Sequence, residues 1–196
     1  MDKIALPKHI FFTGVPGSRW SGIAQIIESL PGFNTTDRSS AREYTHNSYT
    51  GHVGAYFGTG MEFDPIIRDI DKPYSDPTAG CKVLKSHEWA HQLNWISRTN
   101  KNDWIMLVYR PNAVSQNWWH EAGGFDITYP NYDFYENSVQ MYDEIKRQNK
   151  RINEFSMSKR LRWFPFTAEW CEKTFGSKPL APIPVWDDVR VAIFKI

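Results

Sequence analysis

The sequence predicts a single α/β domain with a mainly parallel central sheet and helices on both of its faces. Short apolar runs alternate along the chain with segments of helical spacing, and this alternation is typical of a parallel sheet. The 196 residues are enough for one domain with a real core and few for two. The first apolar run also breaks into a Gly/Pro/Ser loop before a helix, which is the start of a strand-loop-helix unit.

Composition narrows the class of protein without naming a function. The formal net charge of +1 argues against broad nucleic-acid binding, so an anion site would have to be local. The two cysteines, Cys81 and Cys171, are too few for a disulfide framework or a metal cluster. No apolar run reaches the roughly 18 residues of a membrane span, and the start shows no signal pattern. We therefore expect a soluble, cytoplasmic protein without a metal.

The first strand, loop and helix follow directly from this pattern. Ile10–Phe12 reads as a buried strand and Gly14–Ser18 as the turn after it. The helix that follows has apolar residues on its inner face, namely Ile23, Ile26, Ile27 and Leu30. A glycine-containing loop at a helix start lets backbone N–H groups converge on an anion, so the layout favours phosphate binding.

The later elements are predicted by the same criteria. The strands are expected at Cys81–Lys85, Trp104–Tyr109, Leu161–Phe164 and Val189–Phe194. The helices are expected at Trp89–Arg98, after an Asn112 cap, at Tyr132–Phe155 and at Thr167–Phe175. The segment Asn34–Gly80 has no strong periodicity, and we expect a substrate-facing excursion with short helices there.

The first loop departs from the P-loop of nucleotide triphosphatases. Gly14 and Ser21 occupy the first and last positions of the pattern G-x-x-x-x-G-K-[ST]. Arg19 and Trp20, however, stand where that pattern has Gly and Lys. The loop therefore fails as a triphosphatase signature, although it keeps the layout of an anion-binding turn.

Three motifs fall at strand ends, in the order TGVPGSRWS, CKVLKSH and IMLVYRPNAVSQNWW. In this order and setting the chain resembles the sulfotransferases that use 3′-phosphoadenosine 5′-phosphosulfate (PAPS), over about its first 120 residues. The resemblance implies the P-loop-like α/β architecture of that family. It implies that PAPS is the sulfuryl donor and that a hydroxyl or amine group of a small molecule or carbohydrate is the acceptor.

The resemblance also assigns residue roles. Lys85, Ser86 and His87 match the family's K-T-H, whose histidine is the catalytic base. Arg110 and Ser115 match the arginine and serine that hold the 3′-phosphate. The residues implied in donor binding are Pro16, Gly17, Ser18, Arg19, Trp20, Ser21, Arg110 and Ser115. Lys85 or Arg19 would neutralise the leaving phosphate, and Trp20 would stack on adenine.

The chain departs from the family pattern in four respects. Gly17 replaces the usual basic residue of the loop, and Arg19 replaces its glycine. The spacing from Arg110 to Ser115 is short, and no C-terminal glycine-rich R-K-G segment is present in the sequence. An arginine can supply the lost charge, because its planar fork of donors fits phosphate and sulfate oxygens.

Two other functions stay open at this point. A nucleotide kinase of the P-loop class would need the missing loop lysine and a magnesium-binding aspartate after an apolar strand. A noncatalytic binding or assembly protein would keep the scaffold while Gly17 and Arg19 diverged. For the acceptor pocket, we expect a lining from Asn34–Gly80 and Phe125–Tyr135, including Asp126, Tyr129, Asn131, Tyr132 and Asp133.

Overall fold

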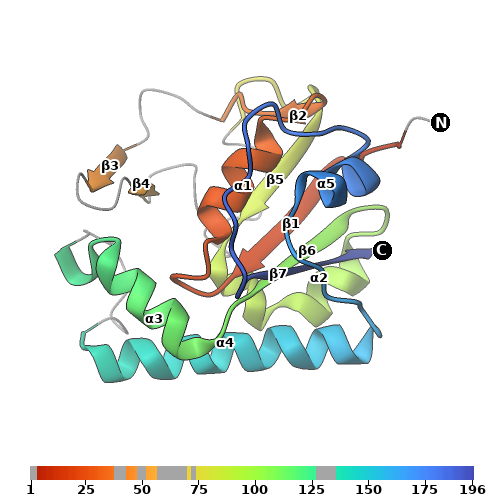
Figure 1. Ribbon diagram of the computed structural model, residues 1–196. Coiled ribbons are helices and arrows are strands. Elements are labelled where there is room, and N and C mark those ends of the chain that lie inside the picture. The colour runs from red at the N-terminus through yellow and green to blue at the C-terminus, as the bar shows by residue number, and fades with distance from the viewer. Residues whose placement is uncertain (1–3, 38–42, 48–51, 57–69, 72–73, 127–135) are drawn as a thin grey trace.

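A five-stranded sheet forms the centre of the molecule, in the order β2-β5-β1-β6-β7 (Figure 1). The computed structural model describes residues 4–37, 43–47, 52–56, 70–71, 74–126 and 136–196. The strands are β1 (His9–Gly14), β2 (Phe33–Asn34), β5 (Cys81–Lys85), β6 (Trp104–Tyr109) and β7 (Arg190–Lys195). The pairs β1–β5, β1–β6 and β2–β5 are parallel, and β7 runs antiparallel to β6. The predicted mainly parallel sheet is confirmed.

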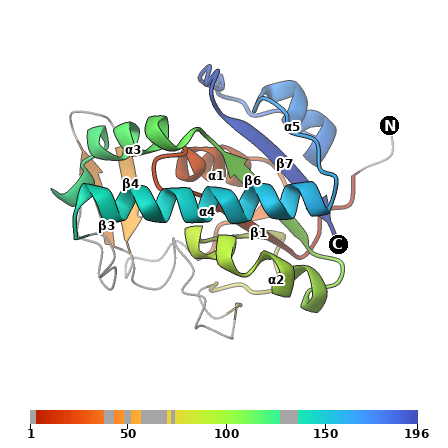
Figure 2. The ribbon, with the colours of Figure 1, turned by 90° about the horizontal axis from the view of Figure 1, so that it is seen from below.

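Helices cover both faces of this sheet, as the sequence predicts. One face carries α1 (Trp20–Glu28) and α5 (Ala168–Phe175). The other carries α2 (Leu93–Thr99), α3 (Asn112–Glu121) and α4 (Ser138–Ser158). Figure 2 shows α4 running across the whole width of its face. The described helices and sheet therefore form three layers, with an apolar core on each side of the sheet.

The two cores follow from the alternation of side chains along the strands. Ile10 and Phe12 of β1 pack with α1 and α5, whereas Phe11 packs with α2 and α4. Both faces of each inner strand are buried, which is why these strands read as continuous apolar runs. The same geometry brings the carboxyl ends of β1, β5 and β6 to one edge.

Several predicted elements differ in their bounds or in kind. The helix predicted at Trp89–Arg98 is a 3₁₀ helix, η1 (His87–His91), followed by α2, because η1 begins at a Ser86 cap. The long helix begins at Ser138, where the side chain of Asn137 caps it, and not at Tyr132, which lies outside the described residues. The strand predicted at Leu161–Phe164 is only a single bridge from Phe164 to Val191.

The segment Asn34–Gly80 holds a β-hairpin within its described part. Strands β3 (Glu43–Asn47) and β4 (His52–Tyr56) pair antiparallel in a sheet of their own. The expectation of short helices has no counterpart in the described residues of this segment, and most of the segment lies outside them. A further 3₁₀ turn, η2 (Gly124–Asp126), ends the described part of the chain before α4. Among the described residues, no helix is long and apolar enough to cross a bilayer.

Candidate functional site

The three motifs meet at the carboxyl edge of the sheet. In the strand register Phe12 lies beside Lys85, and Gly14 lies beside Val108. From β1 the chain passes through α1 to β2, which lies on one side of β1 in the sheet. The strands β6 and β7 lie on the other side of β1, so the strand order reverses between β1 and β6. Ligands of open α/β sheets bind at such a reversal, outside the carboxyl ends of the strands. The edge is therefore the candidate site of the fold.

The loop after β1 is held in place by close backbone packing. Gly17 has a φ of 76°, and a Cβ built on it would lie 1.8 Å from the carbonyl oxygen of Ser115. Only glycine fits there, since any side chain would collide with the backbone of α3. The N–H of Ser18 donates to the carbonyl of Val15 at 3.0 Å and closes the turn. The glycine at position 17 thus has a structural reason.

Arg19 is the boundary residue between this loop and α1. Its backbone is left-handed, with a φ of 69°, and no side chain caps the helix that starts beside it. Its guanidinium carbon lies 3.1 Å from the centre of the Trp118 ring, in a cation–π stack. Burial, and then the charge of Arg110, lower the pKa of Arg19 to about 10. The group stays cationic at neutral pH.

Arg110 holds the loop and a C-terminal segment together. Its Nη1 donates to the carbonyl of Gly17 at 3.0 Å, and its Nε donates to Oδ2 of Asp188 at 2.9 Å. The Arg110 side chain is almost buried. Ser115 is fully buried, and its hydroxyl donates to the carbonyl of Arg110 at 3.4 Å. The structure therefore places Arg110 against the loop and Ser115 behind it.

The other loop residues differ in how much they contribute to the open edge. The Ser18 hydroxyl is buried and has no hydrogen-bond partner. Pro16 is buried, and Ser21 is half-buried in the first turn of α1. The ring of Trp20 packs beside Phe12, with 6.2 Å between the ring centres. Trp20 is half-buried and packs against the core.

Lys85 forms a buried ion pair. Its Nζ lies 2.7 Å from Oε1 of Glu28, which ends α1, and both side chains are almost inaccessible. A buried ammonium needs such a partner because desolvation of an unpaired charge is very unfavourable. The predicted role of Lys85 at a leaving phosphate therefore meets a competing carboxylate in this structure.

His87 is buried and belongs to a chain of polar side chains on α4. Its Nδ1 is 2.7 Å from Nε2 of Gln148, and Gln148 Nε2 is 2.8 Å from Oε1 of Glu144. Glu144 in turn meets Nε2 of His91 at 2.9 Å. Burial lowers the pKa of His87 to about 3. The imidazole is therefore neutral at physiological pH.

The comparisons with known proteins add no identity. No family model, curated protein or solved structure matches this chain. The candidate site therefore stands on its own residues and geometry. Among the described residues there is no group of three or more His, Cys, Asp or Glu side chains that could hold a metal ion.

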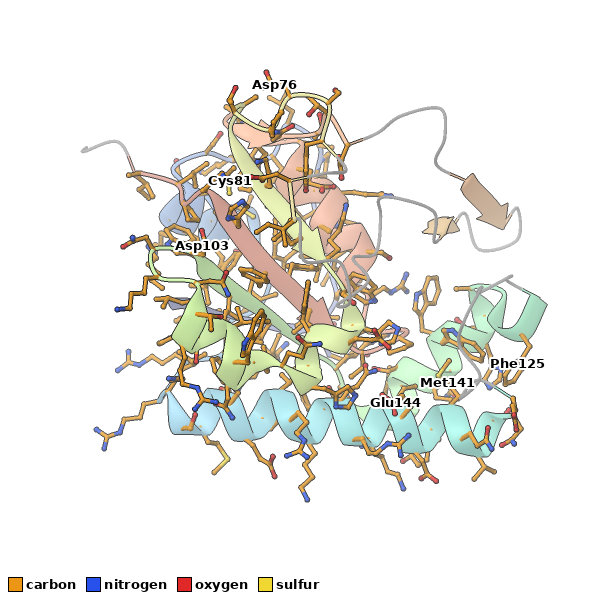
Figure 3. All side chains as sticks on the ribbon, turned by 180° about the vertical axis from the view of Figure 1, so that it is seen from behind. Asp76, Cys81, Asp103, Phe125, Met141 and Glu144 are labelled. Carbon is orange, nitrogen blue, oxygen red and sulfur yellow. The ribbon has the colours of Figure 1, made fainter. Side chains whose placement is uncertain are left out.

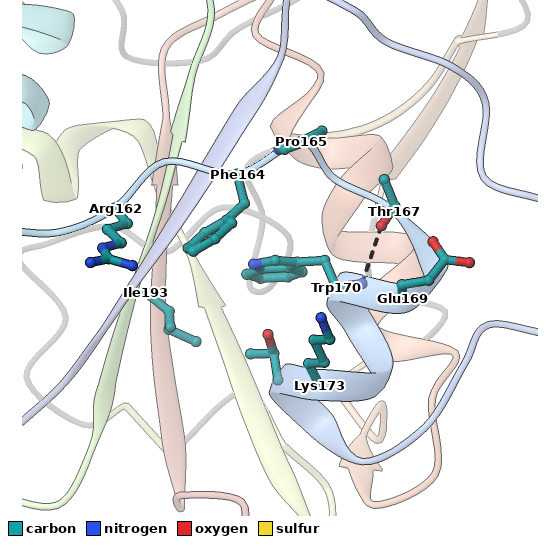
Figure 4. A pocket seen from close by; sticks show the side chains of 9 residues that line it. Arg162, Phe164, Pro165, Thr167, Glu169, Trp170, Lys173 and Ile193 are labelled. Atoms are coloured by element: carbon teal, nitrogen blue, oxygen red, sulfur yellow. Dashed lines mark hydrogen bonds between the residues drawn. The ribbon is translucent and has the colours of Figure 1, made fainter.

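A hollow of about 360 Å³ lies elsewhere, between α5 and the outer side of β7 (Figure 4). Phe164 and Trp170 form its apolar part, and Arg162 and Lys173 lie on its rim. Ile193, which also lines it, pairs with Met106 in the middle of β6. The hollow is therefore distant along the strands from the motif edge and takes none of its residues.

Four residues at or behind the site were not predicted from the sequence: Glu28, Gln148, Glu144 and Asp188. Glu144 and Gln148 carried a usable signal, because they share the inner face of α4 with Met141, Ile145 and Ile152. Polar residues on a buried helix face usually belong to a hydrogen-bond network. Asp188 carried no such signal in the sequence, because only the tertiary fold brings it to Arg110. Of the expected acceptor-lining residues, Tyr129, Asn131, Tyr132 and Asp133 lie outside the described residues.

Proposed function

We propose that this protein binds PAPS at the carboxyl edge of its sheet and transfers the sulfuryl group to a hydroxyl or amine acceptor. The observation that carries the proposal is the setting of Arg19. Its guanidinium is stacked on Trp118 beside the uncapped start of α1, and its buried Nε has no hydrogen-bond partner. A fixed cation next to free helix N–H groups is suited to a phosphate or sulfate group.

The loop residues fit such a group. The buried Ser18 hydroxyl has a hydrogen bond to give, and no described salt bridge includes Arg19. Arg110 lies close enough to Arg19 to lower its pKa, and the carboxylates of Asp188 and Glu121 lie close enough to act in the opposite direction, so two cations and two carboxylates share this edge. The P-loop-like sulfotransferase architecture belongs to the same proposal, since β1 is the central strand of the sheet and its loop leads directly into α1.

In this proposal Arg19 neutralises the charge that develops on the leaving phosphate. Positioned donors of this kind act strongly where water is excluded. Arg110 holds the loop through Gly17 and shares its guanidinium between that carbonyl and Asp188. A 3′-phosphate at Arg110 would compete with the Asp188 carboxylate. His87 is the proposed base for the acceptor, a role that is typically worth about 10²–10⁴-fold in rate.

Calorimetric titration with 3′-phosphoadenosine 5′-phosphate tests donor binding, with adenosine monophosphate and ATP as controls. We expect binding that depends on the 3′-phosphate. Arg19→Gln should weaken it by about tenfold or more, because a hydrogen bond to a charged group contributes about 1.5–3 kcal/mol. Arg98→Gln, on the exposed side of α2, is the matched control. Absence of binding, or equal loss in both variants, would contradict the proposal, and a preference for ATP would favour a kinase.

A second candidate is a noncatalytic protein that binds the same nucleotide. It is favoured by the ion pair of Lys85 with Glu28 and by the hydrogen bond that occupies Nδ1 of His87. Incubation with sulfur-labelled PAPS and a phenol, such as 2-naphthol, separates the two. Labelled aryl sulfate would support the enzyme. Tight donor binding with neither transfer nor donor hydrolysis would support the binding protein.

A further inference from the structure

The side-chain amide of Gln148 lies between a buried histidine and a buried carboxylate. Its Nε2 is 2.7 Å from Nδ1 of His87 and 2.8 Å from Oε1 of Glu144. All three side chains are inaccessible or nearly so. Glu144 lies on α4 on the side that faces the rest of the fold (Figure 3). At these two distances the facing atoms of each pair must act as donor and acceptor toward each other.

Glu144 fixes which way the amide points. Burial raises the pKa of Glu144, but hydrogen bonds from His91, Gln148 and Arg147 outweigh it and lower the pKa to about 2. The side chain is therefore a carboxylate at neutral pH and can only accept hydrogen bonds. The Gln148 group that faces it must be the NH₂ group. With the amide turned over, two oxygens would face each other at this distance.

The amide then determines the protonation of the imidazole. One hydrogen of the NH₂ group goes to Glu144, and the other points to Nδ1 of His87. A neutral imidazole has one nitrogen that accepts and one that carries the proton. We propose that Gln148 is a positioning residue that fixes the tautomer of His87, with the lone pair on Nδ1 and the proton on Nε2.

The opposite tautomer of His87 would require the side-chain amide of Gln148 to turn over. A proton on Nδ1 would face an amide hydrogen, so Gln148 would have to present its Oε1 instead. That oxygen is buried and has no hydrogen-bond partner among the described residues. Turning it toward His87 also places it near the Glu144 carboxylate. The carboxylate therefore holds the amide, and through it the imidazole, in one arrangement.

For sulfuryl transfer, which rests on the proposed function, the tautomer of His87 decides which ring nitrogen can accept a proton. A base that takes the acceptor proton through Nε2 needs its lone pair on that nitrogen. In the tautomer set by Gln148, Nε2 carries a proton and donates. His87 would become a base at Nε2 only after the Gln148 amide has turned. The identity of residues 144 and 148 thus controls whether His87 can act as a base.

Nitrogen NMR of the labelled histidines in the intact protein tests the tautomer directly. In the unaltered chain we expect an unprotonated Nδ1 and a protonated Nε2 for His87 at neutral pH. A protonated Nδ1 would overturn the proposal without any variant. The double variant Glu144→Gln with Gln148→Glu exchanges the two groups and conserves net charge. It should place a carboxylate against Nδ1 and move the ring proton there.

The chain offers a matched control for this exchange. Gln140 Nε2 lies 3.4 Å from Oε2 of Glu136, four residues away, on the exposed side of the same region. Glu136→Gln with Gln140→Glu should leave the His87 tautomer unchanged. An unchanged tautomer in the exchange at residues 144 and 148 would overturn the proposal. The readout needs no donor, so failure of PAPS binding leaves it intact, and turnover should rise in this variant only if the proposed reaction also holds.

Discussion

The ammonium nitrogen of Lys85 lies 2.7 Å from a carboxylate oxygen of Glu28, and both side chains are almost completely buried. The pair joins the carboxyl end of β5 to the last turn of α1. A buried ion pair is strongly interdependent, because removal of one partner leaves the other charge without compensation.

Lys85→Met should therefore reduce the free energy of unfolding by about 3–5 kcal/mol. The double variant Lys85→Met with Glu28→Leu should recover most of that loss, since an apolar pair of similar volume leaves no buried charge. Urea unfolding of the three proteins measures both effects. Equal destabilisation by the single and double variants would show that the pair does not behave as a buried ion pair.

Gly17→Ala should disrupt the loop. Its φ of 76° and the 1.8 Å approach of a Cβ to the Ser115 carbonyl leave no room for a methyl group. The left-handed backbone alone costs about 1–2 kcal/mol for a residue with a Cβ. We expect at least that loss of stability together with weaker binding of 3′-phosphoadenosine 5′-phosphate, measured by urea unfolding and calorimetry.

Gly22→Ala is the control for that substitution. Gly22 lies in α1, and the nearest atom to a Cβ there is on Trp186 at 3.7 Å. Alanine in a helix interior is favoured over glycine by about 0.5–1 kcal/mol, so this variant should be stabilised. A destabilised Gly22→Ala together with an unaffected Gly17→Ala would contradict the loop geometry.

The buried His87 should make stability depend on pH. Burial lowers its pKa from 6.5 to about 3, so the native state remains neutral while the unfolded chain takes up a proton. Stability is thus complete above pH 6.5 and falls as the pH decreases toward about 3. The slope is about 1.4 kcal/mol per pH unit within that window.

His87→Asn should remove this slope, because asparagine has no proton to gain and its carbonyl can still accept from Gln148. Unfolding free energies at pH 6.5 and at pH 5.5 measure this slope above pH 4.5, the ordinary pKa of the Glu144 carboxyl. His120→Asn, at an exposed position on α3, should keep the slope. A slope that persists in His87→Asn would mean that another group causes it.

Trp118 should support nucleotide binding through Arg19. The stack at 3.1 Å holds the guanidinium in place, and cation–π contacts contribute about 0.5–2 kcal/mol. We expect Trp118→Leu to weaken 3′-phosphoadenosine 5′-phosphate binding by an equivalent amount in calorimetry. Trp95→Leu replaces an exposed tryptophan on α2 and should have no effect. Similar losses in both would argue against a specific role of the stack.

The inner strands were predictable because burial on both faces leaves a signal in the local sequence. The bounds Cys81–Lys85 and Trp104–Tyr109 agree with β5 and β6. The antiparallel direction of β7 was not predictable, since direction depends on the path of the chain between strands. The burial of Val139 was not predictable either. This residue continues the apolar spacing of α4, yet it lies near the start of the helix and is 70% exposed.

The candidate site could be predicted only in part, because its residues depend on partners that are distant in the sequence. The sequence places the loop, Lys85, His87 and Arg110 at strand ends, and the structure brings these strand ends to one edge. The partners that decide their chemistry come from distant segments. Arg110 meets Asp188 across 78 positions, Lys85 meets Glu28 across 57, and His87 meets Gln148 across 61.

We propose that the loop after β1 binds the phosphosulfate end of the nucleotide. Amide NMR of the labelled protein titrated with 3′-phosphoadenosine 5′-phosphate tests it most directly. We predict saturable shifts of the backbone N–H signals of Gly17, Ser18 and Arg19, with smaller changes at the hollow near Trp170. Unchanged loop signals at saturating nucleotide, or shifts centred on Trp170, would contradict nucleotide binding at this loop.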